Sequence, residues 1–238
     1  MGLVDEVAYV TYSHSSCEDI WEAYVGELNK YSPKMASYAC LDKDTNVFSN
    51  VHIYDDEAPY YLQMLGCLKM VKEDFIIPML EDFILYDHVQ QDKMNTALKF
   101  LEDNPEYSYV RLIKSGVRSA EVLKGEIYEV PLDAPYPYSM QPSIWRKKDF
   151  IKLYKRSKVE FIRQEQGHHE AYRKLKMKGG YFYDNEERRK SSNHYNSSVF
   201  PFIATAVIKG KWNMGEYKEE LSPIFEEYGI DPSERGTS

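Results

Sequence analysis

The sequence predicts an α/β domain built on a mixed, mainly parallel sheet with helices on both faces. The first half of the chain alternates short β-rich runs with amphipathic helical runs about four times, which is typical of βαβ units. Polar residues also follow the ends of these β-rich runs. Because ligands of parallel sheets bind at the carboxyl ends of the strands, the second observation indicates where a site would form.

Hydrophobic periodicity and turn residues give the expected elements of the first half. Ser16 is a candidate N-cap for the first helix, and Pro33 ends the first strand–helix unit. We interpret residues up to about 115 as a nucleotide-binding half. Strands are expected over 6–12, 35–41, 51–54, 74–80 and 107–113, and helices over 18–30, 60–71 and 90–102.

The second half, from about 116 to 238, is less regular, and we interpret it as the half that binds sugar and acceptor. Residues 126–145 are rich in Pro and Tyr, and a polar loop is expected over 184–198. The chain shows no internal repeat and no linker, so it is predicted to form one domain over 1–238. Helices are expected over 147–156, 165–177 and 216–228, and a last strand over 200–208.

Composition excludes several classes of protein. With 238 residues, 43% of them hydrophobic, the chain can bury one sizeable core, and its net charge of −8 argues against a nucleic-acid binder. The three cysteines are widely spaced, which favours reduced thiols and a cytoplasmic location. No signal peptide or membrane-spanning run is expected, but the basic stretch 146–156 leaves a peripheral membrane contact open.

The most informative local pattern is the acidic pair Glu81-Asp82 at the end of an apolar strand. A carboxylate in such a place is costly unless a positive charge lies beside it. Mn²⁺ or Mg²⁺ would supply that charge, since these ions use a few carboxylates together with substrate phosphates. Adjacent strand residues point to opposite faces, so we predict Asp82 as the metal ligand. The alternative is an acidic pair that is solvated or caps a helix.

Four stretches together resemble the GT-A family of glycosyltransferases, especially small enzymes of large algal viruses. They span nearly the whole chain, and their order and spacing carry more weight than any one of them. The second stretch falls where the family has an Asp-x-Asp motif, but this chain has Glu-Asp-Phe there, which puts the strength of metal binding in doubt. The stretches are residues 7–12 with the Ser13-His14 turn, 80–87, 138–146 and 210–212.

The resemblance implies a nucleotide-sugar donor, with UDP the most frequent nucleotide in the family, and a glycan acceptor. It implies Mn²⁺ or Mg²⁺ on Asp82, and we add His194 of the polar loop as a second candidate ligand. Glu81 is expected beside the donor, and Lys211 is expected near its phosphates. The remaining donor-site positions that the resemblance implies are Thr11, Tyr12, His14, Asp42, Gln141 and Trp145.

Sugar transfer needs a base that takes the proton of the acceptor hydroxyl. Glu165 is the first candidate, because it resembles the acidic position after the Trp segment in inverting relatives; Glu170 is the second and Asp133 the third. An exposed acid at a helix start, stabilised by the helix dipole, is the alternative for Glu165. Since a base is present and no nucleophile is evident, inversion is expected.

Two other functions stay open at this stage. A nucleotidyltransferase that makes sugar nucleotides would share the sheet and the metal-binding acid. Such enzymes usually have a Gly-rich basic loop after the first strand, where this chain has Ser13-His14-Ser15-Ser16. A non-catalytic sugar-binding module on a transferase-like fold is the second alternative. The absence of Gly-x-x-x-x-Gly-Lys and Gly-x-Gly-x-x-Gly argues against P-loop and dinucleotide-binding enzymes.

Overall fold

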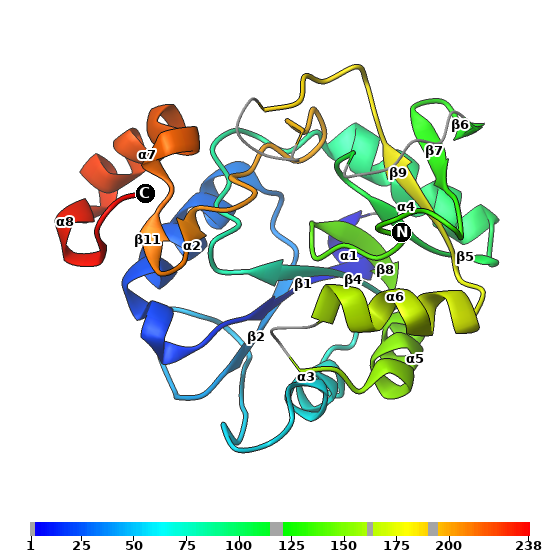
Figure 1. Ribbon diagram of the computed structural model, residues 1–238, viewed down its shortest axis with the longest axis horizontal. Helices are drawn as coiled ribbons and strands as arrows, with labels where there is room; N and C mark the ends of the chain where they lie inside the picture. Colours follow the sequence, from blue (N-terminus) through cyan, green and yellow to red (C-terminus); the bar gives the residue numbers. More distant parts are fainter. Residues whose placement is uncertain (1–2, 115–120, 161–163, 190–194) are drawn as a thin grey trace.

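A nine-stranded sheet forms the centre of the computed structural model, which describes residues 3–114, 121–160, 164–189 and 195–238 (Figure 1). The strands of this sheet are β1 (Val7–Tyr12), β2 (Ala36–Leu41), β3 (Val51–Ile53), β4 (Phe75–Leu80), β5 (Tyr107–Arg111), β6 (Val122–Lys124), β7 (Ile127–Val130), β8 (Ser143–Arg146) and β9 (Lys178–Phe182). Their order is β3-β2-β1-β4-β8-β5-β9-β7-β6. A separate two-stranded sheet pairs β10 (Val207–Ile208) with β11 (Lys211–Trp212).

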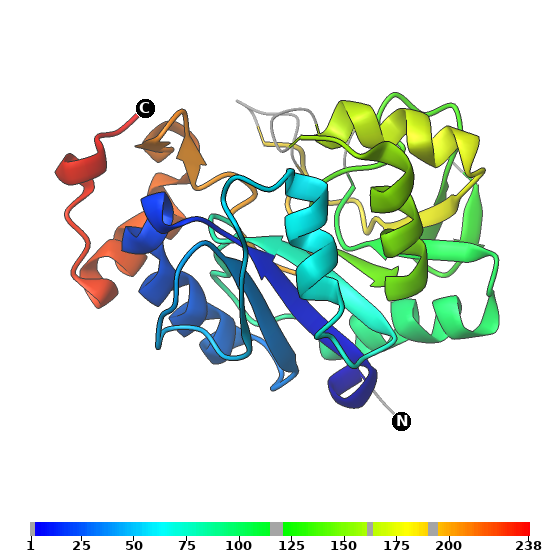
Figure 2. The same cartoon turned by 90° about the horizontal axis from the view of Figure 1, so that it is seen from below.

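Helices cover both faces of the large sheet (Figure 2). One hydrophobic cluster joins the sheet to α2, α4 and α7, and a second cluster joins it to α3, α5 and α6. Two short helices, α1 and α8, lie near the ends of the chain. The helices are α1 (Leu3–Glu6), η1 (Ser15–Cys17), α2 (Glu18–Tyr31), α3 (Tyr60–Leu68), α4 (Gln91–Asp103), α5 (Lys147–Ser157), α6 (Gln164–Lys174), α7 (Met214–Tyr228) and α8 (Pro232–Arg235).

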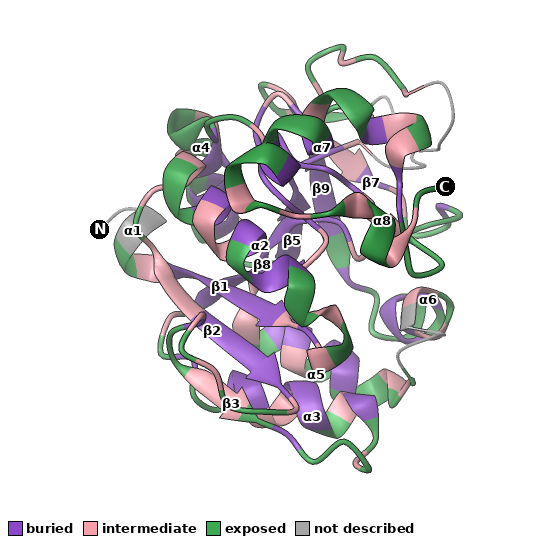
Figure 3. Ribbon diagram, turned by 90° about the vertical axis from the view of Figure 1, so that its left-hand side faces the viewer, coloured by how far each residue is buried: buried purple, intermediate pink, exposed green. Residues whose placement is uncertain are grey.

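The predicted mixed, mainly parallel sheet flanked by helices is confirmed. Strands β3, β2, β1 and β4 are parallel, and β8 is inserted antiparallel between β4 and β5. Strand β9 is parallel to β5, so only β7 and β8 run against the other strands of this sheet. Because β8 comes from the second half of the chain, the two halves share one sheet. Figure 3 shows the inner strands of the sheet largely buried, the edge strand β3 partly exposed, and the outer sides of the helices exposed.

The expected strand over 200–208 is wrong for most of its length. Only 207–208 belong to a strand, and Phe202 makes a single bridge to Leu85. The residues that suggested a strand, such as Phe200 and Ile203, are instead buried in the core as an irregular segment. Pro201 has no N–H to offer a ladder, which agrees with this outcome.

Strand β9 is absent from the sequence-based expectations, because its Gly179-Gly180 pair weakens the strand pattern. The structure explains the first glycine. A Cβ atom at position 179 would lie 2.2 Å from the ring of Tyr109 on the neighbouring strand, so a side chain there cannot be accommodated without displacing that ring. The tyrosine therefore packs across the backbone of β9, which explains a glycine in the middle of a central strand.

Candidate functional site

The topology places a switch point at the carboxyl ends of β1 and β4. From β1 the chain moves outward to β2 and β3, and it then returns to β4 on the other side of β1. The helix after β1 and the helix before β4 lie on opposite faces of the sheet, in different hydrophobic clusters. The connections therefore diverge at this point, which is where open α/β sheets bind ligands. The predicted site residues that follow β1, β2 and β4 converge there.

The turn after β1 is held by hydrogen bonds from three directions. The Ser13 N–H donates to the carbonyl of Cys40 (3.1 Å), and the Tyr54 hydroxyl donates to the Ser13 carbonyl (3.0 Å). The Trp21 indole N–H donates to Ser13 Oγ (2.8 Å). The serine turn is thus fixed by β2, by the segment after β3 and by α2. A rigid turn at this position presents its backbone and side chains in one geometry to a ligand.

Asp42 closes this turn from the end of β2. Its carboxylate accepts hydrogen bonds from the Ser15 N–H (2.7 Å) and from Ser15 Oγ (2.5 Å). Burial raises the pKa of Asp42, but the two bonds from Ser15 and the charge of His14 outweigh burial, and the pKa is lowered. Asp42 therefore remains ionised near neutral pH. Its contacts build the site, and a direct contact with the base or ribose of a donor remains a prediction.

His14 lies between two carboxylates at the switch point of the sheet. Its Nε2 is 3.5 Å from Asp42 Oδ2 and 3.7 Å from Asp56 Oδ2, and its side chain is 41% exposed. The backbone N–H of Ser16 donates to Nδ1 (3.0 Å), which places the proton of a neutral ring on Nε2, facing the two acids. The imidazole is thereby oriented and accessible.

Tyr12 forms an aromatic wall with two other tyrosines. Its ring stacks on Tyr54 at 5.3 Å and meets the edge of Tyr60 at 4.8 Å, while its hydroxyl donates to Gln63 Oε1 (2.7 Å). Thr11 lies deeper: it is fully buried, and its hydroxyl is 2.8 Å from that of Tyr24. Of the two residues, only Tyr12 presents a partly exposed side chain to a ligand.

Glu81 and Asp82 are the two central residues of a tight turn, closed by a hydrogen bond from the Phe83 N–H to the Leu80 carbonyl (3.1 Å). The expectation of one carboxylate on each strand face is therefore wrong, because β4 ends at Leu80. The two side chains nevertheless have different surroundings. Hydrogen bonds connect Glu81 with Cys17 and Ser13, whereas Asp82 accepts from the backbone of Val207.

Both carboxyl groups are held in an environment that disfavours their charge. Burial raises the pKa of Glu81, although hydrogen bonds from Cys17 and Ser13 and the charge of Arg235 partly offset this. Burial raises the pKa of Asp82 further, and the charge of Glu81 adds to the effect. Two half-buried acids that repel each other would be stabilised by a cation.

The pair fits a metal ion whose other ligands are phosphate groups of a substrate and water. Among the residues that the structure describes, no group of three or more His, Cys, Asp and Glu side chains is placed to hold a metal. A closed protein cage is therefore not formed by those residues. Mg²⁺ and Mn²⁺ commonly use only one or two carboxylates, with water and substrate phosphates as the other ligands. The oxygen atoms of Glu81 and Asp82 are ligands of that type.

Arg235 is a site residue that sequence reasoning missed. Its guanidinium is paired with Asp19, donates to the Gly210 carbonyl (3.4 Å), lies 5.7 Å from the Trp212 ring centroid, and lowers the pKa of Glu81. The sequence contains a cap signal for helix α8, because Asp231 accepts from the Ser233 N–H (2.8 Å). No local signal, however, indicates that α8 packs against β11 and brings the charge of Arg235 within electrostatic range of Glu81.

The thiol of Cys17 lies in the same cluster but is not a nucleophile at neutral pH. Burial raises its pKa to about 12, and the charge of Glu81 contributes to this. A thiol is reactive as its thiolate, which this environment suppresses. The cluster therefore offers carboxylate and guanidinium chemistry.

A second group of predicted residues reaches the same edge from the other half of the chain. Because β8 runs antiparallel to β4 and β5, the residues before it lie at the carboxyl ends of those strands, and the Leu112 N–H donates to the Pro142 carbonyl (2.9 Å). Glu165 Oε1 accepts from the Met140 N–H (3.0 Å). This bond ties the first turn of α6 to the edge and places Glu165 there.

The other two candidate bases lie elsewhere. Glu170 is exposed farther along α6 and forms an ion pair with Lys174 at 2.5 Å. Asp133 is exposed next to Ala134, whose carbonyl accepts from Arg173 near the far end of α6 (2.9 Å). Of the three acids, Glu165 is the one that accepts a hydrogen bond from the residues directly before β8, through the Met140 N–H.

The remaining predicted residues have varied surroundings. Trp145 is 2% exposed and stacks on Tyr109 at 4.3 Å, so it belongs to the core. Gln141 is buried at the edge, and its Oε1 has no hydrogen-bond partner among the described residues. Lys211 is exposed on β11, next to the Gly210 carbonyl that Arg235 binds. His194 lies outside the described residues, so its role as a metal ligand stays a prediction.

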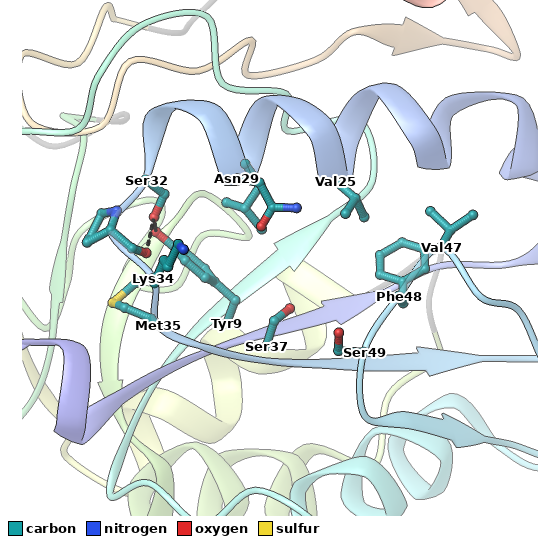
Figure 4. A pocket seen from close by; sticks show the side chains of 12 residues that line it. Tyr9, Val25, Asn29, Ser32, Lys34, Met35, Ser37, Val47, Phe48 and Ser49 are labelled. Carbon is teal, nitrogen blue, oxygen red and sulfur yellow. Dashed lines mark hydrogen bonds between the residues drawn. The ribbon is translucent and has the colours of Figure 1, made fainter.

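A cavity of about 210 Å³ lies away from this edge, between α2 and β2 (Figure 4). Tyr9 and Ser37 contribute from the starting halves of their strands, and the Tyr9 hydroxyl is 2.6 Å from Ser32 Oγ. Val25 and Asn29 line it from the C-terminal half of α2. The cavity therefore does not belong to the carboxylate site.

No protein-family model and no curated protein sequence matches the chain. Solved structures do resemble it. A cytidylyltransferase from Leptospira borgpetersenii is 12% identical with a TM-score of 0.49, covering 96% of this chain and 97% of the other. S. aureus TarS (residues 1–349) is 13% identical with a TM-score of 0.48, covering 97% and 68%. A UDP-glucose pyrophosphorylase complexed with UDP-glucose is 11% identical with a TM-score of 0.47, covering 77% and 92%. At this distance the likenesses carry no argument about activity.

Proposed function

We propose that this protein is a metal-dependent glycosyltransferase that moves a sugar from a nucleotide-sugar donor, UDP-linked, to a hydroxyl group of a glycan, with inversion. The observation that carries the proposal is the Glu81-Asp82 turn at the switch point of the sheet. Two half-buried acids with raised pKa values are suited to a divalent cation, and a donor diphosphate would complete its ligands. The partly exposed ring of Tyr12, which is held by Tyr54 and Tyr60, offers an aromatic surface for a base or sugar ring.

The proposed reaction assigns one role to Glu165 and another to the acidic pair with Arg235. The carboxylate of Glu165 takes the proton of the acceptor hydroxyl, and the freed oxygen forms a bond to the anomeric carbon. The bond between that carbon and the diphosphate breaks, and its electron pair leaves on the diphosphate oxygen. When bound to Asp82 and Glu81, Mn²⁺ or Mg²⁺ would neutralise this leaving group as a Lewis acid. Arg235 holds positive charge beside Glu81 and so helps to retain the anionic diphosphate.

The test is a screen of nucleotide sugars with and without Mn²⁺, followed by product analysis. A donor is expected to raise the melting temperature, and more so with metal, since a ligand at 100 times its Kd stabilises by about 2.7 kcal/mol. Release of UDP from that donor, with sugar found on an acceptor glycan, supports the proposal.

Two other results would overturn it. Formation of pyrophosphate from UTP and a sugar 1-phosphate, without sugar transfer, would identify a nucleotidyltransferase. Donor binding with neither transfer nor hydrolysis in the presence of Mn²⁺ would identify a non-catalytic binding module. Transfer releases UDP, nucleotidyl transfer releases pyrophosphate, and a binding module forms no product, so the two assays together separate the three functions.

A further inference from the structure

The charge of the chain is distributed very unevenly. Residues 147–178 contain 11 Lys or Arg and 4 Asp or Glu, a net charge of +7. Since the whole chain carries −8, the remaining residues carry −15. A basic segment of this size in an acidic protein creates a local field of opposite sign to that of the molecule as a whole.

The structure gathers the described part of this segment on one outer layer. Helices α5 and α6 pack against each other outside the sheet, side by side in both views (Figures 1 and 2). Their apolar positions, such as Leu153 and Tyr172, face the core. The cations point outward and are exposed; we call them the basic face, and they are Lys148, Lys152, Lys155, Arg156, Lys158, Arg173, Lys174 and Lys176.

Little of this charge is neutralised within the protein. Lys152 pairs with Asp149 at 2.8 Å, and Lys174 pairs with Glu170 at 2.5 Å. Among the described residues, Lys148, Lys155 and Lys158 take part in no ion pair within 4 Å. On α5, positions 148, 152 and 155 are spaced i, i+4, i+7, so these side chains form one stripe along the helix.

We propose that the basic face docks onto the surface of an anionic lipid bilayer. A flat membrane can contact this face alone, whereas a long nucleic acid that extends past it would meet the −15 carried by the other residues. Leu175, 37% exposed among the cations at the end of α6, adds a small apolar contact. The described residues contain no helix that is both long and apolar enough to cross a membrane, so this attachment is peripheral.

The attachment is electrostatic because the apolar sides of α5 and α6 are already packed in the core and cannot insert into the membrane. Each Lys or Arg near an anionic surface contributes about 1 kcal/mol, and the attraction decays within a Debye length of about 8 Å at physiological salt. Binding should therefore require anionic lipid and weaken steeply with salt.

Docking through this face would also place the candidate site near the membrane. Glu165 belongs to the first turn of α6, and the 11 residues of that helix span about 16 Å at 1.5 Å per residue. An acceptor glycan held at the bilayer would then lie within reach of the edge. This last step rests on the proposed transferase function; the docking itself does not.

The test is co-sedimentation of the full chain with vesicles of phosphatidylcholine containing 30% phosphatidylserine, and with vesicles of phosphatidylcholine alone. The parent protein is expected to bind only the anionic vesicles, and to be released by 0.5 M NaCl. Neutralising four cations (Lys148→Gln, Lys152→Gln, Lys155→Gln and Lys158→Gln) should lower the partition coefficient about fivefold per residue, which corresponds to about 1 kcal/mol each. The combined loss is several-hundred-fold.

A matched control changes three exposed lysines elsewhere: Lys34→Gln, Lys209→Gln and Lys218→Gln. This control should bind like the parent, and equal melting temperatures would show that all variants are folded. Equal binding of the fourfold variant and the parent, binding to neutral vesicles, or stronger binding to a DNA duplex than to anionic vesicles would each overturn the proposal. None of these readouts depends on enzymatic activity, so failure of the docking proposal is distinguishable from failure of the proposed transferase function.

Discussion

Replacing Asp82 by Asn should make the metal-free protein more stable while removing its response to metal. Burial and the charge of Glu81 raise the pKa of Asp82, so the folded state binds this proton more tightly than the unfolded state does. The stability linked to that proton is fully present below the unfolded pKa of about 3.9 and is lost as pH rises through the folded pKa. At neutral pH and without metal, the carboxyl group of Asp82 therefore costs the fold stability.

The expected gain follows from the local contacts. An unpaired buried polar or charged group costs about 1–3 kcal/mol, and Asp82 is only half-buried, so we expect about 1–2 kcal/mol for Asp82→Asn. The Asn Oδ1 can still accept the hydrogen bond from the Val207 backbone, so no contact is lost. For a chain of this size, about 1 kcal/mol shifts the melting temperature by 2–4 °C, which gives a rise of about 2–8 °C.

The assay is thermal unfolding of both proteins at pH 4 and pH 7.5, with and without Mn²⁺. The variant should melt higher at pH 7.5 without metal, and the difference should shrink towards pH 4, which lies close to the unfolded pKa of Asp82. Mn²⁺ should stabilise the parent at pH 7.5 and leave the variant unchanged. Asp92→Asn, an exposed acid in the first turn of α4, is the control; loss of its helix-dipole interaction should lower stability by up to about 1 kcal/mol.

The reasoning is refuted if Asp82→Asn melts below the parent at pH 7.5 without metal. It is also refuted if Mn²⁺ raises the melting temperatures of the two proteins equally. The first result would mean that the Asp82 carboxylate has a stabilising partner in the fold besides the backbone of Val207. The second would mean that the metal binds elsewhere.

Two further predictions concern the candidate base Glu165 and the hydrogen bond between Ser15 and Asp42. Glu165→Gln should lower kcat for transfer by about 10²–10⁴-fold and leave donor affinity unchanged. Glu170→Gln is the control and should change neither quantity. Equal losses of kcat in the two variants would reject Glu165 as the base. Ser15→Ala removes one hydrogen bond to Asp42 and should cost about 1.5–3 kcal/mol at pH 7 in urea unfolding. The pKa of Asp42 is lowered in the folded state, so the stability that this hydrogen bond contributes is present above the unfolded pKa and is lost as pH falls through the folded pKa. If Ser15→Ala lowered the free energy of unfolding equally at pH 3 and pH 7, this explanation would be contradicted.

Much of the first half could be predicted from sequence, because periodicity is a local property. The alternation of strands and helices over about the first 115 residues is confirmed, and the polar residues that follow β1, β2 and β4 do share one edge. Their convergence follows from the geometry of parallel strands, whose carboxyl ends align once the strands pair. In this way the sequence alone located the edge and its acidic pair, whereas the turn that holds the pair was found only in the structure.

Tertiary structure decided the features that depend on which distant segments meet. The insertion of β8 between β4 and β5 made Trp145 a core residue and carried Glu165 to the edge. The return of α8 brought Arg235 to Glu81, and the packing of α5 on α6 gathered the basic face. Pairing and packing partners are chosen by the free energy of the whole fold, and no local pattern records that choice.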